Sequence, residues 1–144
     1  MSRITVDTGV FVDYIDKKSP YHEQAKAIIG SLGKVELLLP PITLAEVCYV
    51  TTRILNEAGV QDAFDKAVQF VKWLYSHPAV EIVNELELHT ETAKIKLKYR
   101  IALADCYVLA LSRLKDCKAV FRKREKEMPK EIEKDFDVIF LEDY

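Results

Sequence analysis

Short apolar runs alternate along the chain with longer stretches whose apolar residues recur every three or four positions. The runs at residues 3–6, 35–39, 79–83, 118–121 and 138–141 predict five short strands. Helical periodicity predicts helices at residues 20–30, from 44 to near 59, and at 62–76, 88–98 and 102–114. Strands that alternate with helices indicate an α/β domain with a mostly parallel central sheet. Such sheets bind ligands beyond the carboxyl ends of their strands.

Prolines set several of the expected element boundaries. Ser19-Pro20 has the pattern of a helix N-cap followed by proline at the first helical position. Pro40-Pro41 closes the second strand, and His77-Pro78 ends the helix at 62–76, because a residue before proline avoids the helical conformation.

The length and the cysteines favour one cytoplasmic domain. The chain has 144 residues, and no linker divides it, so we expect a single domain over residues 1–144. Its three cysteines are odd in number and lack metal-binding spacing, which argues against a disulfide framework and fits a reducing compartment. We expect neither a secretory signal nor a membrane span.

One carboxylate interrupts an apolar segment. Every residue from 101 to 111 except Asp105 is apolar or weakly polar, and on a helix Ile101 and Leu109 lie within one turn of it. A carboxylate that loses its hydration there is unstable unless it is paired, protonated or metal-bound. We expect Asp105 to be functional. The alternative is a structural carboxylate that accepts backbone hydrogen bonds or pairs with a buried Arg or Lys.

Two further acids could converge with Asp105 at one edge of the sheet. Asp7 follows the first strand directly and could cap the next helix, although Thr8 could do so instead and leave Asp7 free. Glu46 taken alone is typical of an ordinary helix-boundary glutamate. Three carboxylates brought together need a cation, and hard ions such as Mg²⁺ and Mn²⁺ prefer clustered oxygen ligands.

The segments around these acids resemble the three best-marked motifs of the PIN domain family, in particular the VapC-type toxin ribonucleases. They read Ile4-Thr-Val-Asp7-Thr8, Pro41-Ile-Thr-Leu-Ala-Glu46-Val and Ile101-Ala-Leu-Ala-Asp105-Cys-Tyr-Val-Leu-Ala110. The resemblance extends over nearly the whole chain and includes the order of the elements. It implies a three-layer α/β/α fold and a metal-dependent endoribonuclease that hydrolyses RNA.

The resemblance also implies roles and partners. Asp7, Glu46 and Asp105 would hold Mg²⁺ or Mn²⁺, with Asp7 and Asp105 as direct ligands and Glu46 completing the shell or orienting the attacking water. The chain would be the toxin of a toxin–antitoxin pair. It would form a homodimer and bind a small antitoxin that blocks the site.

The chain departs from the family at two places. Gly9 stands where PIN domains often carry Ser or Asn. The usual Thr-x-Asp segment with a fourth acidic residue is replaced by VFRKREKEM at residues 120–128, where Glu125 is the best substitute and Glu127 the second. This departure leaves open an alternative, a catalytically weakened PIN-like protein that binds RNA or acts as a scaffold.

Charge is segregated along the chain. The whole chain has a formal charge of −2, but residues 94–130 hold 12 Lys or Arg and four Asp or Glu, so +8 there is balanced by −10 elsewhere. RNA is bound mainly through Lys and Arg. The candidate RNA-binding residues are Lys98, Arg100, Arg122, Lys123 and Arg124. The alternative is a solvated face whose charges form ion pairs.

A receiver-like phosphoacceptor domain is a rival interpretation, since such domains also gather acids at strand ends. Its acceptor aspartate would follow the middle strand, but here Pro40-Pro41 follows Leu39. The helix at 62–76 also carries more aromatic residues, Phe70, Trp73 and Tyr75, than one core face would use. These residues are compatible with a partner surface and equally with core packing.

Overall fold

The computed structural model describes residues 2–144, which form one five-stranded parallel sheet. The strands are β1 (Ser2–Val6), β2 (Val35–Leu39), β3 (Val80–Ile82), β4 (Lys118–Phe121) and β5 (Val138–Phe140). Their order across the sheet is β3-β2-β1-β4-β5, and each neighbouring pair runs parallel. All five predicted strands are present, and β2 and β4 have the predicted bounds.

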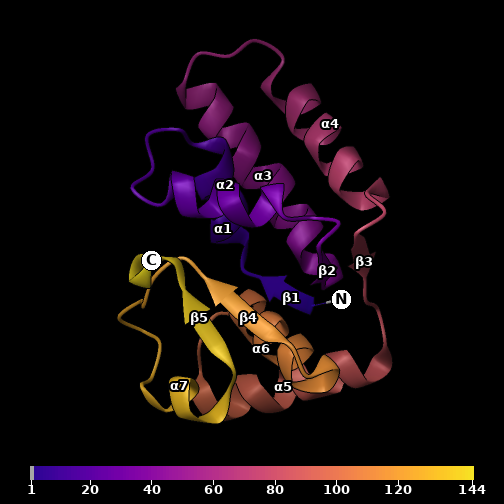
Figure 1. The fold of residues 1–144 in the computed structure, drawn as a ribbon, viewed down its shortest axis with the longest axis vertical. Coiled ribbons are helices and arrows are strands. Elements are labelled where there is room, and N and C mark those ends of the chain that lie inside the picture. The colour runs from indigo at the N-terminus through magenta and orange to yellow at the C-terminus, as the bar shows by residue number, and fades with distance from the viewer. Residues whose placement is uncertain (1) are drawn as a thin grey trace.

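Helices cover both faces of the sheet (Figure 1). On one face lie α1 (Thr8–Ile15), α2 (His22–Gly30), α3 (Pro41–Glu57) and α4 (Ala63–Ser76). On the other lie α5 (Leu86–Tyr99), α6 (Leu103–Lys115) and α7 (Glu131–Asp135), and a 3₁₀ turn (Leu141–Asp143) follows β5. The predicted three-layer α/β/α fold is confirmed. Within residues 2–144, no helix has the length and apolar character needed to cross a bilayer.

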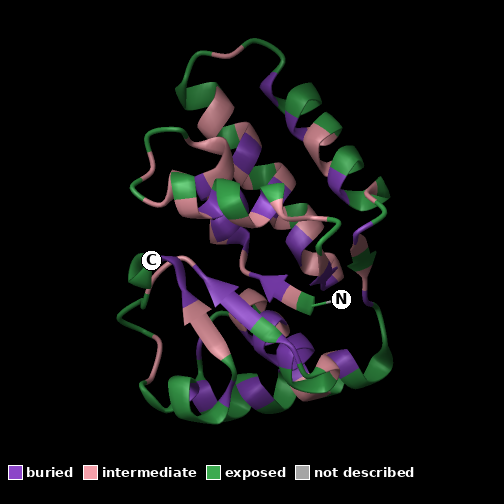
Figure 2. Cartoon of the chain, in the orientation of Figure 1, coloured by how far each residue is buried: buried purple, intermediate pink, exposed green. Residues whose placement is uncertain are grey.

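Two hydrophobic cores lie on the two faces of the sheet. Leu37 and Leu39 of β2 pack with α1, α2, α3 and α4, whereas Leu38 packs with α5 and α6. Successive side chains of a strand point to opposite faces, so a strand covered on both sides buries every residue. This explains the continuous apolar runs in the sequence. Figure 2 shows β4 mostly buried, the edge strands β3 and β5 less so, and exposed residues on the outer faces of the helices.

The start of α2 differs from the prediction. The helix begins at His22 rather than Pro20, so Ser19 is not its N-cap. The Ser19 hydroxyl instead donates to Asp13 Oδ1 at 2.6 Å and accepts a hydrogen bond from the backbone N–H of Tyr21 at 3.1 Å. Ser19 therefore holds a turn against the end of α1. The short helices α1 and α7 were absent from the sequence prediction.

The order of the strands reverses beside β1. From β1 the chain builds outward through β2 and β3, then returns to add β4 and β5 on the other side of β1. In open α/β sheets, this reversal opens a crevice at the carboxyl ends of the central strands. Asp7 follows β1 at this crevice, and its backbone N–H donates to the carbonyl of Val120 in β4 at 2.9 Å. The topology therefore places the end of β1 and the loop after β4 side by side.

Candidate active site

Asp7 lies at the N-cap position of α1 but makes no capping hydrogen bond with its side chain. The residue keeps part of its surface exposed, while the surrounding protein desolvates its carboxyl group. Burial raises the pKa of Asp7 from 3.8 to about 7, and the charges of Asp105 and Glu46 add to the rise against the lowering effect of the Gly9 and Thr8 backbone N–H groups. Within residues 2–144, Asp7 forms no ion pair.

Glu46 reaches the same site from α3. Proline at the first position of this helix fixes its start directly after β2, which places Glu46 in the second turn near the sheet edge. Its Oε1 atom accepts a hydrogen bond from the Thr8 hydroxyl at 2.7 Å. Thr8 therefore caps no helix with its side chain and instead orients Glu46 beside Asp7. The sequence analysis gave Thr8 no such role.

Asp105 occupies the first turn of α6 and is only partly buried. Ala102 and Leu103 in its own turn are exposed. Burial still raises the pKa of Asp105 to about 6, and the charges of Glu46, Glu125 and Glu127 contribute to the rise. A carboxylate in the first helical turn also gains from the helix dipole.

Asp7, Glu46 and Asp105 therefore come together at the switch point of the sheet, where their charges repel one another. This donor set suits a hard divalent cation, because it consists of carboxylate oxygens whose mutual repulsion a cation would relieve. Their present arrangement is not that of a finished coordination shell. Within residues 2–144, no three His, Cys, Asp or Glu side chains are already arranged to hold a metal ion.

Glu125 and Glu127 lie in the exposed loop that follows β4. Both carboxylates are near enough to Asp105 to raise its pKa, with Glu125 having the larger effect of the two. The groups whose charges raise the pKa of Asp7 are Asp105 and Glu46. The loop therefore brings two candidate acids to the Asp105 side of the site.

Arg122 forms a structural ion pair beside Asp7, Glu46 and Asp105, which are called the acidic cluster below. Its Nε and Nη2 atoms donate to the carboxylate of Asp13, which is 1% exposed, at distances of 3.0 to 3.3 Å. The side chain passes over Gly9, where an added Cβ would lie 2.6 Å from Arg122 Cδ. Because Gly9 has no Cβ, the Arg122 side chain has room to reach Asp13. The sequence analysis missed Asp13, although an acid among the apolar residues of 10–15 was a signal of the same kind as Asp105.

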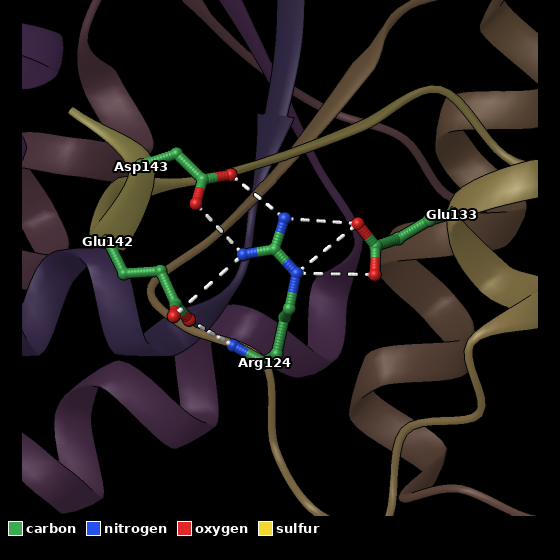
Figure 3. A network of polar contacts seen from close by, with 4 residues as sticks. All are labelled: Arg124, Glu133, Glu142 and Asp143. Atoms are coloured by element: carbon green, nitrogen blue, oxygen red, sulfur yellow. Dashed lines mark hydrogen bonds and ion pairs between the residues drawn. The ribbon is translucent and has the colours of Figure 1, made fainter.

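Arg124 is held by three acids near the C-terminus (Figure 3). Its guanidinium binds Glu133 at 3.0 to 3.2 Å and Asp143 at 2.9 Å, and its backbone N–H donates to Glu142 at 2.6 Å. These contacts join the loop after β4 to α7 and the 3₁₀ turn. Much of this arginine's hydrogen-bonding capacity is therefore used within the protein.

Of the other candidate RNA-binding residues, Lys98 and Arg100 lie at the end of α5, and Lys123 lies in the loop after β4. Lys98 is exposed, 4.0 Å from Asp135, and Arg100 caps α5 in a left-handed conformation with its side chain exposed. Arg113, Lys115 and Lys118 also pair with acids. The positive segment is thus partly neutralised by ion pairs between elements.

Fold and site together define an α/β protein with an acidic centre at the carboxyl edge of its sheet. A family model described as the PIN domain matches residues 4–128, so the chain belongs to the PIN domain family. A search of curated protein sequences finds no match.

Several solved structures share this fold at low sequence identity. FitAcB from Neisseria gonorrhoeae is 20% identical with a TM-score of 0.63, and the match covers 98% of this chain and 99% of that one. VapC20 from Mycobacterium tuberculosis, a toxin that cleaves the sarcin–ricin loop, is 17% identical with a TM-score of 0.61, and the match covers 81% of this chain and 86% of that one. VapBC2 from Rickettsia felis, bound to a promoter DNA fragment, is 11% identical with a TM-score of 0.63 over 96% of each chain.

Proposed function

We propose that this protein is a metal-dependent endoribonuclease. The observation that carries the proposal is the convergence of Asp7, Glu46 and Asp105 at the switch point of a PIN fold. The pKa values of Asp7 and Asp105 are raised, and within residues 2–144 neither forms an ion pair. A protein that retains mutually repelling carboxylates in its ligand crevice keeps them for binding rather than for stability.

Each residue of the acidic cluster has a separate role in this proposal. Asp7 and Asp105 hold Mg²⁺ or Mn²⁺, and Glu46, oriented by Thr8, completes the shell or positions the attacking water. Glu125 is the fourth acid at the Asp105 side of the site, with Glu127 as the second candidate. When bound, the metal supplies an activated water and stabilises charge on the phosphoryl oxygens. Lys98, Arg100, Arg122, Lys123 and Arg124 are the proposed RNA contacts.

The biological setting is a toxin–antitoxin pair. Solved structures with this fold include VapBC complexes and a toxin–antitoxin complex from Klebsiella pneumoniae, which supports a small antitoxin as the partner. A homodimer is supported by exposed aromatic side chains on α4, where Phe64 is 61% and Tyr75 is 64% exposed. An RNA substrate and three free thiols favour the cytoplasm. A monomer by sizing and light scattering would contradict the dimer.

The nuclease proposal is tested by Mn²⁺-dependent cleavage of single-stranded RNA by the wild type and Asp105→Asn. We expect the variant to fold and to lose cleavage. Asp65→Asn is the matched control, because Asp65 also lies in the first turn of a helix, is exposed, and is not among the groups whose charges raise the pKa of Asp7 or Asp105. Equal cleavage by wild type and Asp105→Asn would overturn the assignment.

The alternative function is a weakened PIN-like protein that binds RNA or acts as a scaffold. The observation that favours it is the loop after β4, in which exposed glutamates replace the usual aspartate. RNA binding by the wild type with no cleavage in either Mg²⁺ or Mn²⁺ would establish this alternative.

A further inference from the structure

A polar cavity of about 430 Å³ adjoins the acidic cluster on the α1 side. Its inner end is formed by Thr8 and Gly9, and a Cβ built on Gly9 would lie 3.0 Å from Asp7 Oδ2. Thr8 donates to Glu46. The cavity therefore lies next to the site at which the proposed function places the scissile phosphate.

Three cations from separate parts of the chain line this cavity. They are Lys18 from the turn after α1, Arg53 from α3 and Arg122 from the loop after β4. The two acids of the lining are already engaged, because Asp13 binds Arg122 and Ser19, and Asp16 accepts a hydrogen bond from the backbone N–H of Lys18. Asp13 is thus neutralised by Arg122, whereas Asp16 keeps its charge, so the three cations exceed the two acids of the lining by one.

Much of the positive charge is available to a ligand. In the part of the chain that the structure describes, neither Lys18 nor Arg53 forms an ion pair. Arg122 binds Asp13 through Nε and Nη2, and no hydrogen bond within residues 2–144 uses its Nη1. These groups differ from Arg113, Lys115 and Arg124, which are paired with acids.

The geometry of α3 links the cavity to the cluster. Glu46, Val50 and Arg53 follow one another at intervals of four and three residues, so they lie on one face of the helix. Glu46 and Arg53 are separated by about 10 Å along the helix axis, at 1.5 Å per residue. A strand that places one phosphate at Glu46 can thus continue along this face toward Arg53.

We propose that this cavity binds a backbone phosphate of the RNA strand next to the scissile one, through Lys18, Arg53 and the free edge of Arg122. The proposal rests on the proposed function for its substrate class. It assigns RNA binding to the α1 and α3 side of the site, whereas Lys18 and Arg53 lie outside the positive segment at residues 94–130. The contacts are to phosphate, so they contribute affinity and register and do not read sequence.

The test measures RNA binding without cleavage. Fluorescence anisotropy with a labelled single-stranded RNA in EDTA compares the wild type with the double variant Lys18→Gln/Arg53→Gln over a range of salt concentrations. Both side chains are exposed, so the variant is expected to fold. We expect roughly tenfold weaker binding at low salt and a salt slope reduced by about one, since each phosphate contact on a single strand contributes about 0.7.

The matched control is Lys34→Gln/Lys66→Gln, which removes the same charge from exposed positions before β2 and on α4. Unchanged affinity and slope in the cavity variant would overturn the proposal, as would an equal loss in the control. The result is independent of the nuclease assay. If the wild type does not cleave RNA but the cavity variant binds RNA more weakly as expected, the nuclease proposal is refuted and the cavity proposal stands. If the wild type cleaves RNA but the cavity variant binds as tightly as the wild type, the cavity proposal is refuted and the nuclease proposal stands.

Discussion

The acidic cluster predicts that the metal-free protein loses stability as the pH rises, and that Asp7→Asn removes much of this loss. The folded pKa of Asp7 is about 7 against an ordinary 3.8, because burial and neighbouring carboxylates disfavour its ionised form. The folded protein therefore holds this proton more tightly than the unfolded chain. Folding is penalised progressively as the pH rises from 3.8 to about 7, and the penalty is constant at higher pH.

The size of the effect follows from the pKa difference. One pKa unit corresponds to about 1.4 kcal/mol, so a rise from 3.8 to about 7 corresponds to about 4 kcal/mol. Asp7 keeps part of its surface exposed, and solvent screening reduces this value, so we expect about 2 to 4 kcal/mol. Asparagine has nearly the same size and retains a carbonyl oxygen, but it carries no charge. The variant should therefore be more stable than the wild type at pH 8.

The assay is urea unfolding of wild type, Asp7→Asn and the control Asp65→Asn in EDTA at pH 4 and pH 8. We expect the free energy of unfolding of Asp7→Asn to exceed that of the wild type at pH 8, and the two to be nearly equal at pH 4. Asp65→Asn should show no such pH-dependent gain. If Asp7→Asn is no more stable at pH 8, or if its gain is the same at both pH values, the assignment of a desolvated and repelled carboxyl is wrong.

Four further predictions concern stability and can be measured by thermal or urea unfolding. Mn²⁺ should stabilise the wild type more at pH 8 than at pH 5, since protons compete for Asp7 and Asp105, and Asp7→Asn should abolish most of this gain. Asp13→Ala should cost about 3 kcal/mol by leaving Arg122 without its buried partner, whereas Asp16→Ala should cost far less. Gly9→Ala should cost about 1 to 2 kcal/mol because its Cβ meets Arg122 Cδ, and this cost should shrink in an Arg122→Ala background. Thr5→Val should stabilise by about 1 kcal/mol, because the buried Thr5 hydroxyl has no hydrogen-bond partner in residues 2–144; an equal or lower stability would contradict that description.

The sequence predicts the sheet well because a strand covered on both faces leaves a continuous apolar run. Leu37, Leu38 and Leu39 are all buried, in alternation on the two faces, and β2 has the bounds that this run indicates. The sequence does not predict the short helix α1, because the helix has only eight residues and the buried Asp13 interrupts the apolar pattern of its inner face. Asp13 finds its partner 109 residues away in Arg122, a contact that no local pattern reveals.

In the candidate site, local sequence patterns likewise indicate some features, whereas others depend on contacts between segments far apart in the sequence. Asp7 directly follows β1, and Glu46 and Asp105 lie in the first two turns of their helices, so local sequence patterns indicate all three as candidates. The hydrogen bond from Thr8 to Glu46 depends on how α1 meets α3, which the sequence does not indicate. Likewise, a sum of charges over residues 94–130 does not show that Arg124 is paired with acids, and it leaves out Arg53, which forms no ion pair within residues 2–144.

The central claim is that Asp7 and Asp105 share a divalent cation. Its most direct test is anomalous diffraction from crystals of this protein grown with Mn²⁺. The account predicts one strong anomalous peak at roughly 2.0 to 2.3 Å from a carboxylate oxygen of Asp7 and from one of Asp105, with Glu46 bound directly or through water. A well-ordered site with no peak at saturating Mn²⁺, or a peak that touches neither aspartate, would contradict it.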